Sequence, residues 1–319
     1  MSDARSGMIC KYANMKCRKH IKQMSVIVFV AFVSACSNDS TVDSHSSKSA
    51  LPAACIDEIK TTESIPQGAY QMGSARAYPE ERPVRQMQVN AFDIDVTEVT
   101  NAQFARFIRD TGYVTSAEKI QPGFDRSGAA VFTPPDVNNS TWWRFVEGAN
   151  WRHPEGPESS IEGRDSDPVV QVSHADAKAY ADWVGRALPS EVQWEYAAKA
   201  GSQTRYVWGE TRTIDGVEQA NTWQGAFPVQ NTQDDGFLRR SPVGCYPPNR
   251  FGLYDMIGNV WEWTDTIYKQ GEGEPVYVIK GGSFLCAENY CRRYRPAARQ
   301  PQEAGFPTNH IGFRTVSVE

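Results

Sequence analysis

Two cysteines near the C-terminal end, Cys286 and Cys291, are the residues of this chain best suited to chemistry. Their spacing of five fits no regular element. On a helix the two side chains would point about 140° apart, and on a strand they would lie on opposite faces. The two sulfurs can therefore meet only if the backbone between them curves, and Gly281 and Gly282 just before them favour a turn.

Two interpretations of this cysteine pair follow from the residues alone. Arg292, Arg293 and Arg295 follow the pair, and nearby positive charge favours thiolate over thiol. Two thiolates could bind a soft metal or carry out redox chemistry. Alternatively, the pair forms a local disulfide of the kind that is common in exported proteins, and from the residues alone the disulfide is favoured.

The composition is that of a globular chain with many loops. Of its 319 residues, 40% are hydrophobic and 22% charged, which is enough apolar mass for one large core or two small ones. A formal net charge of -5 gives no indication of a nucleic-acid partner. Nine tryptophans, 24 glycines and 19 prolines predict a backbone that turns often, with aromatic side chains filling irregular gaps.

The first 36 residues have the pattern of an export signal. Basic residues precede an apolar run over residues 24–33, which is too short to span a bilayer stably. The run ends in Val-Ser-Ala-Cys, which resembles a bacterial lipobox, so Cys36 is expected to be lipidated; an ordinary signal peptide is the alternative. Hydrophilic residues 37–62 predict a flexible tether. The protein is therefore expected to be exported and lipid-anchored to a bacterial membrane, facing the periplasm or the cell surface.

Residues 63–319 are expected to form the folded domain. Residues 65–74 predict a strand edge and a turn, and residues 87–95 predict one further strand. Three short helices are expected to begin after Thr100, at Ser173 and after Ser190, and to end at Gly112, Gly185 and Gly201.

A long segment, residues 124–167, separates the first two helices and has no regular periodicity. A loop of this length is usually functional or disordered, and its tryptophans argue for order. His153 within it has no partner at metal-ligand spacing and is expected to be structural.

Oxygen-bearing side chains recur after the third helix. They are Asn221, Asp235, Asp255, Asn259 and Glu262, and they stand among apolar and aromatic residues. Oxygen ligands spaced through tight turns suit calcium. Asx residues that bond their own backbone are the alternative, and the residues alone leave both open.

The motifs together resemble a known family. Residues from about 65 to 316 are similar to the formylglycine-generating enzymes, also called sulfatase-modifying factors, through GAYQMGS, VTEVTNAQFARFI, GANWRHPEG, ALPSEVQWEYAAKAG, FGLYDMIGNVWEW, GGSFLCAENYCRRYRPAAR and HIGFRTV. GANWRHPEG together with CAENYC is the most selective of these and points to the catalytic members. The resemblance implies an α+β fold, a variant of the C-type lectin fold with little regular secondary structure.

The resemblance also implies a reaction. Family members convert a cysteine in a sulfatase Cys-x-Pro-x-Arg segment to Cα-formylglycine with O2, using Cu(I) held by two cysteinates at the positions of Cys286 and Cys291. Ser283 matches a serine of the oxygen pocket, which Trp261 and Tyr290 are expected to shape. The implied partners are an unfolded sulfatase polypeptide, O2 and a thiol reductant, with residues 124–167 walling the peptide groove.

The family also implies two structural calcium sites. The first comprises Asn221, the Thr222 carbonyl, Asp235 and the Phe237 carbonyl. The second comprises Asp255, the Gly258 and Val260 carbonyls, and Glu262. Bound Ca2+ would hold loops that no helix or strand fixes.

Some features depart from the family pattern. Vertebrate members have a disulfide at the positions of Ala198 and Pro296, whereas here Cys55 and Cys245 remain and are candidates to join each other. The expected lipid anchor is also unusual for the family. It raises the alternative of a non-catalytic, lectin-like lipoprotein with a binding or assembly role.

Overall fold

The computed structural model describes residue 55 and residues 61–120, 123–136, 140–270 and 273–318. All of these belong to one compact unit, Ser49–Glu319. The predictions for the signal segment, for Cys36 and for most of the tether lie outside the described residues. Among the described residues, no helix has the length and hydrophobicity needed to cross a bilayer.

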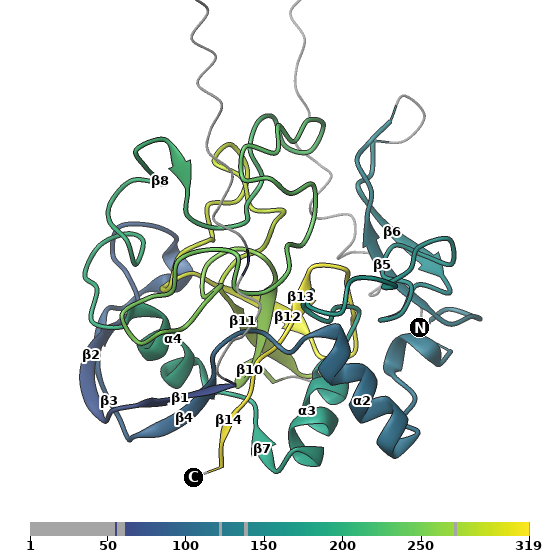
Figure 1. Ribbon diagram of the computed structural model, residues 1–319, viewed down its shortest axis with the longest axis horizontal. Coiled ribbons are helices and arrows are strands. Elements are labelled where there is room, and N and C mark those ends of the chain that lie inside the picture. Colours follow the sequence, from purple (N-terminus) through teal and green to yellow (C-terminus); the bar gives the residue numbers. More distant parts are fainter. Residues whose placement is uncertain (1–54, 56–60, 121–122, 137–139, 271–272, 319) are drawn as a thin grey trace, which may run out of the picture. The chain divides into compact units, whose positions relative to one another are not determined.

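Two four-stranded sheets organise the domain (Figure 1). The first has the order β1 (Thr62–Ile65), β4 (Phe92–Asp95), β14 (Val316–Ser317) and β7 (Arg186–Ala187), with all pairs antiparallel. The second has the order β12 (Arg299–Glu303), β11 (Val276–Lys280), β10 (Trp261–Lys269) and β13 (Ile311–Gly312), with β13 parallel to β10. Since β1 and β14 flank β4, the two ends of the domain meet in one sheet.

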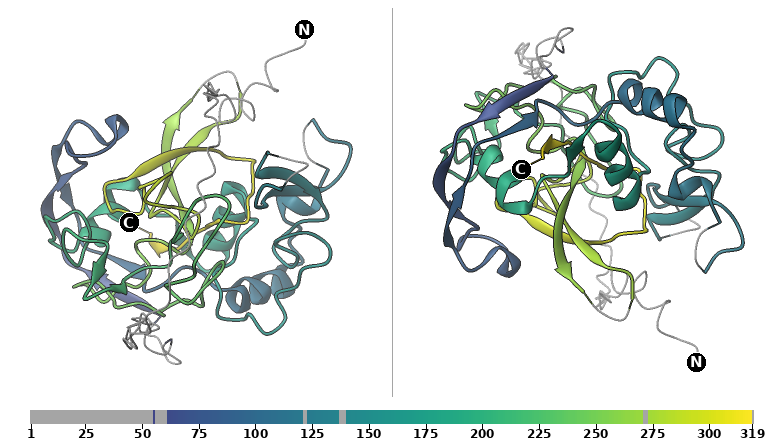
Figure 2. Two further views of the ribbon diagram at one scale, coloured as in Figure 1. Left: turned by 90° about the horizontal axis from the view of Figure 1, so that it is seen from above. Right: turned by 90° about the horizontal axis from the view of Figure 1, so that it is seen from below.

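Three antiparallel two-stranded ribbons complete the β-structure. They are β2 (Gly68–Met72) with β3 (Arg85–Val89), β5 (Gly128–Phe132) with β6 (Trp143–Glu147), and β8 (Thr213–Ile214) with β9 (Val217–Glu218). Of two 3-10 turns, η1 (Pro79–Glu81) lies between β2 and β3, and η2 (Ser116–Glu118) lies between a helix and β5. Figure 2 shows the β2–β3 ribbon and the β5–β6 ribbon on opposite sides of the domain.

The three predicted helices are confirmed as α2 (Asn101–Thr111), α3 (His174–Trp183) and α4 (Glu191–Lys199). Each begins with a capping box, in which the cap hydroxyl and the third helical side chain satisfy backbone N–H groups that have no helical partner. The first helix stops at Gly112, with φ 67°. The other two each end two residues before their predicted glycines.

Two local predictions are wrong. The strand expected over residues 87–95 is two strands, because β3 ends at Val89 and β4 begins at Phe92. Val89 and Phe92 are both buried and lie three positions apart. In a single strand, residues separated by an odd number of positions point to opposite faces, so both could not be buried on one face. The segment over residues 124–167 is not wholly irregular either, since it contains the β5–β6 ribbon. All five residues of β5, GAAVF, are buried, so the strand shows no alternation of apolar and polar residues.

The main core is aromatic and includes the cysteine pair. Phe104 and Phe107 of α2 pack with Trp151, Trp261 and Trp263, and the same cluster contains Cys286 and Cys291. Burying one such large side chain stabilises the fold by roughly 1.5–3 kcal/mol. A second cluster, around Trp194 of α4, joins the β2–β3 ribbon to the first sheet.

The α+β fold with little regular secondary structure is as expected. Between α4 and β10, only β8 and β9 are regular, and residues 281–298 between β11 and β12 contain no helix or strand among the described residues. Cys55 and Cys245 are joined by a disulfide across a sequence separation of 190 residues. This crosslink ties the start of the domain to the loop-rich region.

Candidate active site

The loop after β11 brings the two cysteines together. Gly281 and Gly282 both have positive φ, 95° and 81°, and a Cβ on Gly282 would lie 2.7 Å from the Tyr294 Cα. After this turn the Cys286 N–H donates to the Ser283 carbonyl at 2.8 Å. The Cys291 N–H donates to the Ala287 carbonyl at 3.0 Å. The backbone therefore curves between the cysteines, as their spacing predicts.

The two sulfurs are close but not bonded. The Cys286 and Cys291 Sγ atoms lie 3.4 Å apart, and both cysteines are free thiols. A disulfide bond is about 2.05 Å long, so the structure describes the reduced pair. The loop thus presents two adjacent sulfur donors without further rearrangement of the chain.

The two thiols differ in acidity. The pKa of Cys291 is lowered to about 6, first because the Cys286 S–H donates a hydrogen bond to its sulfur, and also because Arg293 supplies an N–H and a positive charge. Burial raises the pKa of Cys286 well above its usual value. The site therefore favours a thiolate on Cys291 over one on Cys286.

An aromatic wall borders the pair. Cys286 is 2% exposed and Cys291 is 9% exposed, whereas Tyr290 between them is 47% exposed. The Tyr290 ring stacks on Phe227 with centroids 4.4 Å apart, and Trp142 packs edge-on against Tyr290 at 5.9 Å. Trp142 belongs to the segment over residues 124–167, so part of that segment contacts the cysteine loop.

The other two predicted pocket residues, Ser283 and Trp261, are both buried near the pair. Ser283 is fully buried, and its hydroxyl oxygen accepts from the Leu285 N–H at 3.3 Å. Trp261 is buried in the core cluster that contains both cysteines. His153 contacts the Ser159 carbonyl through Nδ1 at 2.6 Å, which fits the structural role expected for it.

The four residues of the first expected calcium site are adjacent. Asp235 Oδ2 accepts from the Thr222 N–H at 2.9 Å, and Oδ1 accepts from the Phe237 N–H at 3.0 Å. Asn221 donates through Nδ2 to the Arg239 carbonyl at 2.8 Å. Burial raises the pKa of Asp235 to about 6, since its hydrogen-bond donors are uncharged. A buried carboxylate that lacks a paired positive charge fits a bound cation.

The second expected calcium site is partly neutralised by a cation of the protein itself. Glu262 accepts from Arg314 at 2.7 and 2.9 Å and from the Trp194 Nε1–H at 2.7 Å. Asp255 Oδ2 accepts from the Gly244 N–H at 2.6 Å, and burial raises the pKa of Asp255 to about 6. Gly258, with φ 86°, provides the turn between Asp255 and Glu262.

A further buried carboxylate near this site was missed by the sequence reasoning. Glu98 Oε1 accepts from the Asn259 Nδ2–H at 3.2 Å, while Oε2 has no hydrogen-bond partner in the described part of the chain. Its pKa is raised by burial and by the nearby charges of Asp255 and Glu262. Three buried acids thus face one guanidinium, that of Arg314. The signal was a glutamate between the apolar residues Val96 and Val99, in a segment that must be buried.

Neither expected calcium site is made of side chains alone. Within the described ranges, no three His, Cys, Asp or Glu side chains are grouped so as to hold a metal ion. Half of the expected ligands are main-chain carbonyls, and the orphaned Glu98 oxygen marks where a positive charge would be stabilised. The donor set around Asp255 therefore fits a hard cation.

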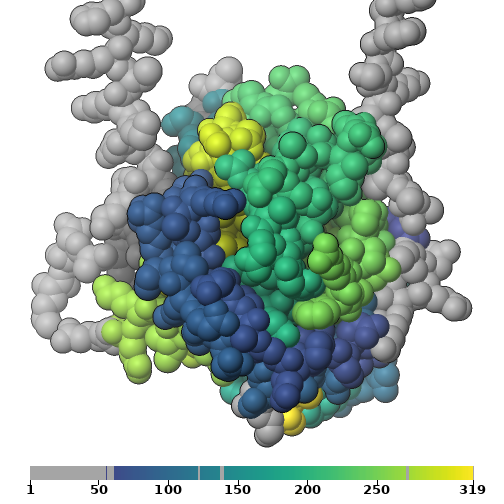
Figure 3. Space-filling model, turned by 90° about the vertical axis from the view of Figure 1, so that its left-hand side faces the viewer, coloured from purple at the N-terminus to yellow at the C-terminus, as the bar shows by residue number. Residues whose placement is uncertain are grey.

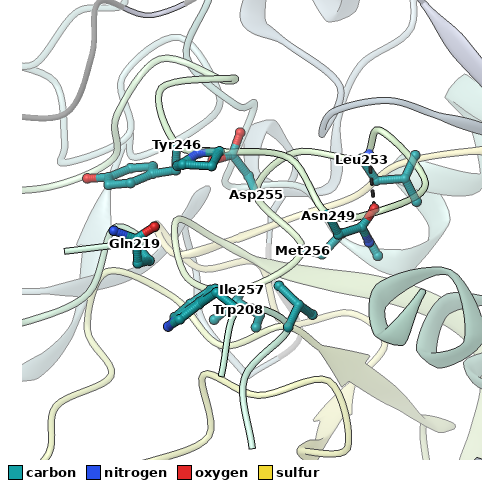
Figure 4. A pocket seen from close by; sticks show the side chains of 10 residues that line it. Trp208, Gln219, Tyr246, Asn249, Leu253, Asp255, Met256 and Ile257 are labelled. Atoms are coloured by element: carbon teal, nitrogen blue, oxygen red, sulfur yellow. Dashed lines mark hydrogen bonds between the residues drawn. The ribbon is translucent and has the colours of Figure 1, made fainter. Parts of the chain in front are cut away.

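A cavity opens on one side of Asp255 (Figure 4). It is a small, partly open hollow of about 10 Å³, lined by Tyr246, Gln219, Trp208 and Asn249, among others. Figure 4 shows Tyr246 next to Asp255, with Trp208 and Ile257 across the cavity from them. The Tyr246 hydroxyl donates to the Asp235 carbonyl at 3.2 Å. The loop that carries Tyr246 and Asp255 therefore links the two candidate calcium sites.

Comparison with known proteins places this chain in a family. Residues 47–318 match the family described as the sulfatase-modifying factor enzyme 1-like domain. The chain is 47% identical to the "Formylglycine-generating enzyme" of Mycobacterium tuberculosis over 287 residues, covering 79% of this chain and 96% of that protein. It is 37% identical to the "Inactive C-alpha-formylglycine-generating enzyme 2" of Bos taurus, covering 79% of this chain and 86% of that protein.

A solved structure supports the fold. The structure of PvdO from Pseudomonas aeruginosa has a TM-score of 0.60 and 23% sequence identity, covering 83% of this chain and 98% of that chain. The likeness at this identity concerns the fold alone. Taken with the sequence match over residues 47–318, it shows that the chain belongs to the sulfatase-modifying factor enzyme family.

Proposed function

We propose that this protein is a formylglycine-generating oxidase that converts a cysteine in a sulfatase Cys-x-Pro-x-Arg segment to Cα-formylglycine. The observation that carries the proposal is the free sulfur pair, Cys286 and Cys291, 3.4 Å apart beside a partly exposed aromatic wall. The 47% identity to a protein named formylglycine-generating enzyme supports the same activity.

Cu(I) is the proposed cofactor, held by Cys286 and Cys291. The fit is chemical, because two adjacent sulfurs, in a site that favours the thiolate form of Cys291, make a soft donor set that suits Cu(I). Bound copper would supply the one-electron and O2 chemistry. The overall reaction balances when one O2 and two reducing equivalents from a thiol turn R–CH2–SH into R–CHO, H2S and H2O.

The residues of the chain have roles of their own in this proposal. The half-exposed Tyr290 and its neighbours Trp142 and Phe227 would hold the peptide against the pair and exclude water. Burial of Cys286, Ser283 and Trp261 would keep the reacting sulfur of the substrate in a dry pocket. An unfolded substrate segment is required, because a folded sulfatase would not bring a backbone segment into a loop-lined site.

Ca2+ is proposed as a structural cofactor at the two sites described above. The support is the buried, incompletely neutralised acids at both places, Asp235 at the first and Asp255 with Glu98 at the second. Ca2+ there would crosslink residues 221–262. Of this stretch, only the last two residues, which begin β10, lie in a strand or helix. The proposed location remains the exported, lipid-anchored one that the N-terminal sequence predicts through Cys36.

The test is a direct assay on a peptide containing Cys-Thr-Pro-Ser-Arg, incubated under air with Cu(I)-loaded protein and a thiol reductant. Turnover lowers the peptide mass by about 18 Da, the change from thiol to aldehyde. Cys286→Ser and Cys291→Ser should each abolish turnover, since one thiolate cannot form the site. The double variant Cys55→Ser, Cys245→Ser is the matched control, because it removes two cysteines outside the site. A copper-loaded protein that leaves the peptide mass unchanged would refute the proposal.

A second candidate is a non-catalytic, lectin-like lipoprotein with a binding or assembly role. It is favoured by the 37% identity to a relative named inactive. Under this alternative, the Cys286→Ser and Cys291→Ser variants keep the biological role. A structural disulfide between the same two cysteines is the remaining alternative, and alkylation before and after reduction, read by mass spectrometry, separates it from a free pair.

A further inference from the structure

A segment from the opposite end of the domain lies on the loop that carries Cys291. Arg293 donates through Nε and Nη2 to Glu80 Oε1, at 3.1 and 2.6 Å, across 213 residues of sequence. Its guanidinium carbon lies 4.0 Å from the ring centroid of Tyr78. The Tyr78 hydroxyl accepts from the Arg292 N–H at 3.1 Å. Two hydrogen bonds and one ring contact thus fix the Arg293 head group, and the Tyr78 hydroxyl holds the main chain beside it.

A second ion pair fastens the same two segments. Arg295 donates through Nη1 to Glu81 Oε2 at 2.9 Å, and both side chains are almost fully buried. Figure 3 shows the yellow C-terminal segment between the blue and the green parts of this face. Tyr78, Glu80 and Glu81 together hold the loop that carries Arg293 and Arg295.

Arg293 in turn reaches the reactive sulfur. Its Nη1 donates to Cys291 Sγ at 3.9 Å. The Arg293 side chain is 25% exposed, so solvent screens its charge only in part. The neighbouring Arg292 differs, since its side chain is 55% exposed and its Nη1 lies 3.3 Å from Glu288 Oε1.

We propose that Arg293, positioned by Glu80 and Tyr78, is the fixed positive charge that stabilises the anionic sulfur pair and favours its binding of a monovalent metal. This inference rests on the proposed function only where it concerns copper. Two thiolates and one Cu(I) carry a net negative charge, which is costly in a buried site unless a cation lies nearby. Glu80 itself is acidic, so its contribution is to hold the guanidinium against the sulfur rather than to add favourable charge.

The first test needs no metal. Reduced, metal-free protein is alkylated at one pH with either iodoacetate or iodoacetamide, and the rates at Cys291 are read by peptide mass spectrometry. A local positive charge favours the anionic reagent, so Arg293→Gln should lower the iodoacetate-to-iodoacetamide rate ratio roughly fivefold, the size of a partly exposed ion pair. Arg292→Gln, with the same charge change one residue away, should leave the ratio unchanged.

Two further variants separate charge from packing. Arg293→Lys keeps the charge and should restore most of the ratio, whereas Glu80→Ala should lower it by releasing the guanidinium. An equal fall in Arg292→Gln and Arg293→Gln, or no fall in either, would overturn the inference.

The second test measures Cu(I) affinity by competition with a chromogenic chelator. Arg293→Gln should weaken binding roughly fivefold relative to Arg292→Gln. If the unaltered protein binds no Cu(I), the copper part of the proposed function fails, while the alkylation ratio still decides the role of Arg293. Equal Cu(I) affinities in the two variants would contradict the inference even in an active enzyme.

Discussion

Arg314 and Glu262 form a bidentate ion pair with no exposure to solvent, with Nε–Oε2 and Nη2–Oε1 distances of 2.7 and 2.9 Å. Arg314 also donates to the main-chain carbonyls of Asp95, Val96 and Tyr254. One guanidinium therefore joins β10, the end of β4 and the loop that carries Asp255. Because every donor is used, the arginine is both a local countercharge and a crosslink between distant segments.

Replacing Arg314 by Ala should destabilise the fold by about 3–5 kcal/mol, since it leaves Glu262 buried and unpaired. The measurement is urea unfolding at neutral pH. Arg126→Ala is the matched control, because Arg126 pairs with Glu147 at the surface, where loss of the pair costs at most about 1 kcal/mol. Similar losses in the two variants would show that the buried pair contributes no more than a surface one.

The helices could be predicted from sequence because their signals are local. Thr100, Ser173 and Ser190 each cap a helix through side chains three positions away, so the start of each helix depends on a few neighbouring residues. The β5–β6 ribbon could not be predicted in this way. Its first strand, Gly128–Phe132, is buried by contacts with the far end of the chain, such as the Phe132 N–H bond to Asn309 Oδ1.

In the candidate site, too, local features could be predicted from the sequence and long-range contacts could not. The spacing of Cys286 and Cys291 was enough to predict that the chain must curve if their sulfurs meet. The signal at Glu98 was weaker and Glu80 gave none, because their roles arise from contacts with Asn259 and Arg293, respectively, more than 160 residues away. Pairing across such distances depends on the tertiary fold, which a single sequence read for local patterns does not reveal.

Calcium should raise the stability of the metal-free protein. At a concentration of 100 times the dissociation constant, the expected gain is about 2.7 kcal/mol per site, seen as a higher melting temperature after EGTA is replaced by Ca2+. Asp235→Asn should remove the gain from the first site, and Glu98→Gln should reduce the gain from the second. Asp234→Asn, beside Asp235 but exposed, is the control and should retain the full shift. No shift in the unaltered protein would favour the alternative that these residues only form Asx turns.

Acid should destabilise the protein through His310. Burial lowers the pKa of His310 to about 3, and its Nδ1 lies 2.6 Å from the Thr308 hydroxyl. In the unfolded chain the pKa returns to about 6.5, so the unfolded state binds the proton between pH 6.5 and 3 and stability falls as pH falls. From pH 6.5 to 5 the loss should be about 2 kcal/mol. Urea unfolding of His310→Asn should show a shallower pH dependence over this range, and an unchanged slope would assign the acid sensitivity to other groups.

Removing the Cys55–Cys245 disulfide should lower stability by about 2–5 kcal/mol, because it closes a long loop of the unfolded chain. The comparison is thermal unfolding of the Cys55→Ser, Cys245→Ser double variant with that of the unaltered protein. Peptide turnover at a temperature well below both transitions should be retained, because neither cysteine belongs to the sulfur pair. A variant as stable as the unaltered protein would show that the loss of the disulfide adds little conformational entropy to the unfolded chain.

Trp142→Ala should weaken substrate binding more than it slows the reaction. The Trp142 ring packs edge-on against Tyr290 at 5.9 Å and against Phe227 at 6.0 Å, so its loss removes one side of the aromatic wall without touching either cysteine. An aromatic contact contributes about 1 kcal/mol beyond burial, which predicts a KM for the Cys-Thr-Pro-Ser-Arg peptide raised about five- to tenfold, with kcat changed less. Phe124→Ala is the matched control, since Phe124 stacks on Phe145 at 4.0 Å, away from the Tyr290 contact. Steady-state kinetics on both variants decides the matter: a fall in kcat at constant KM in Trp142→Ala would place this side chain in the chemical step rather than in peptide binding.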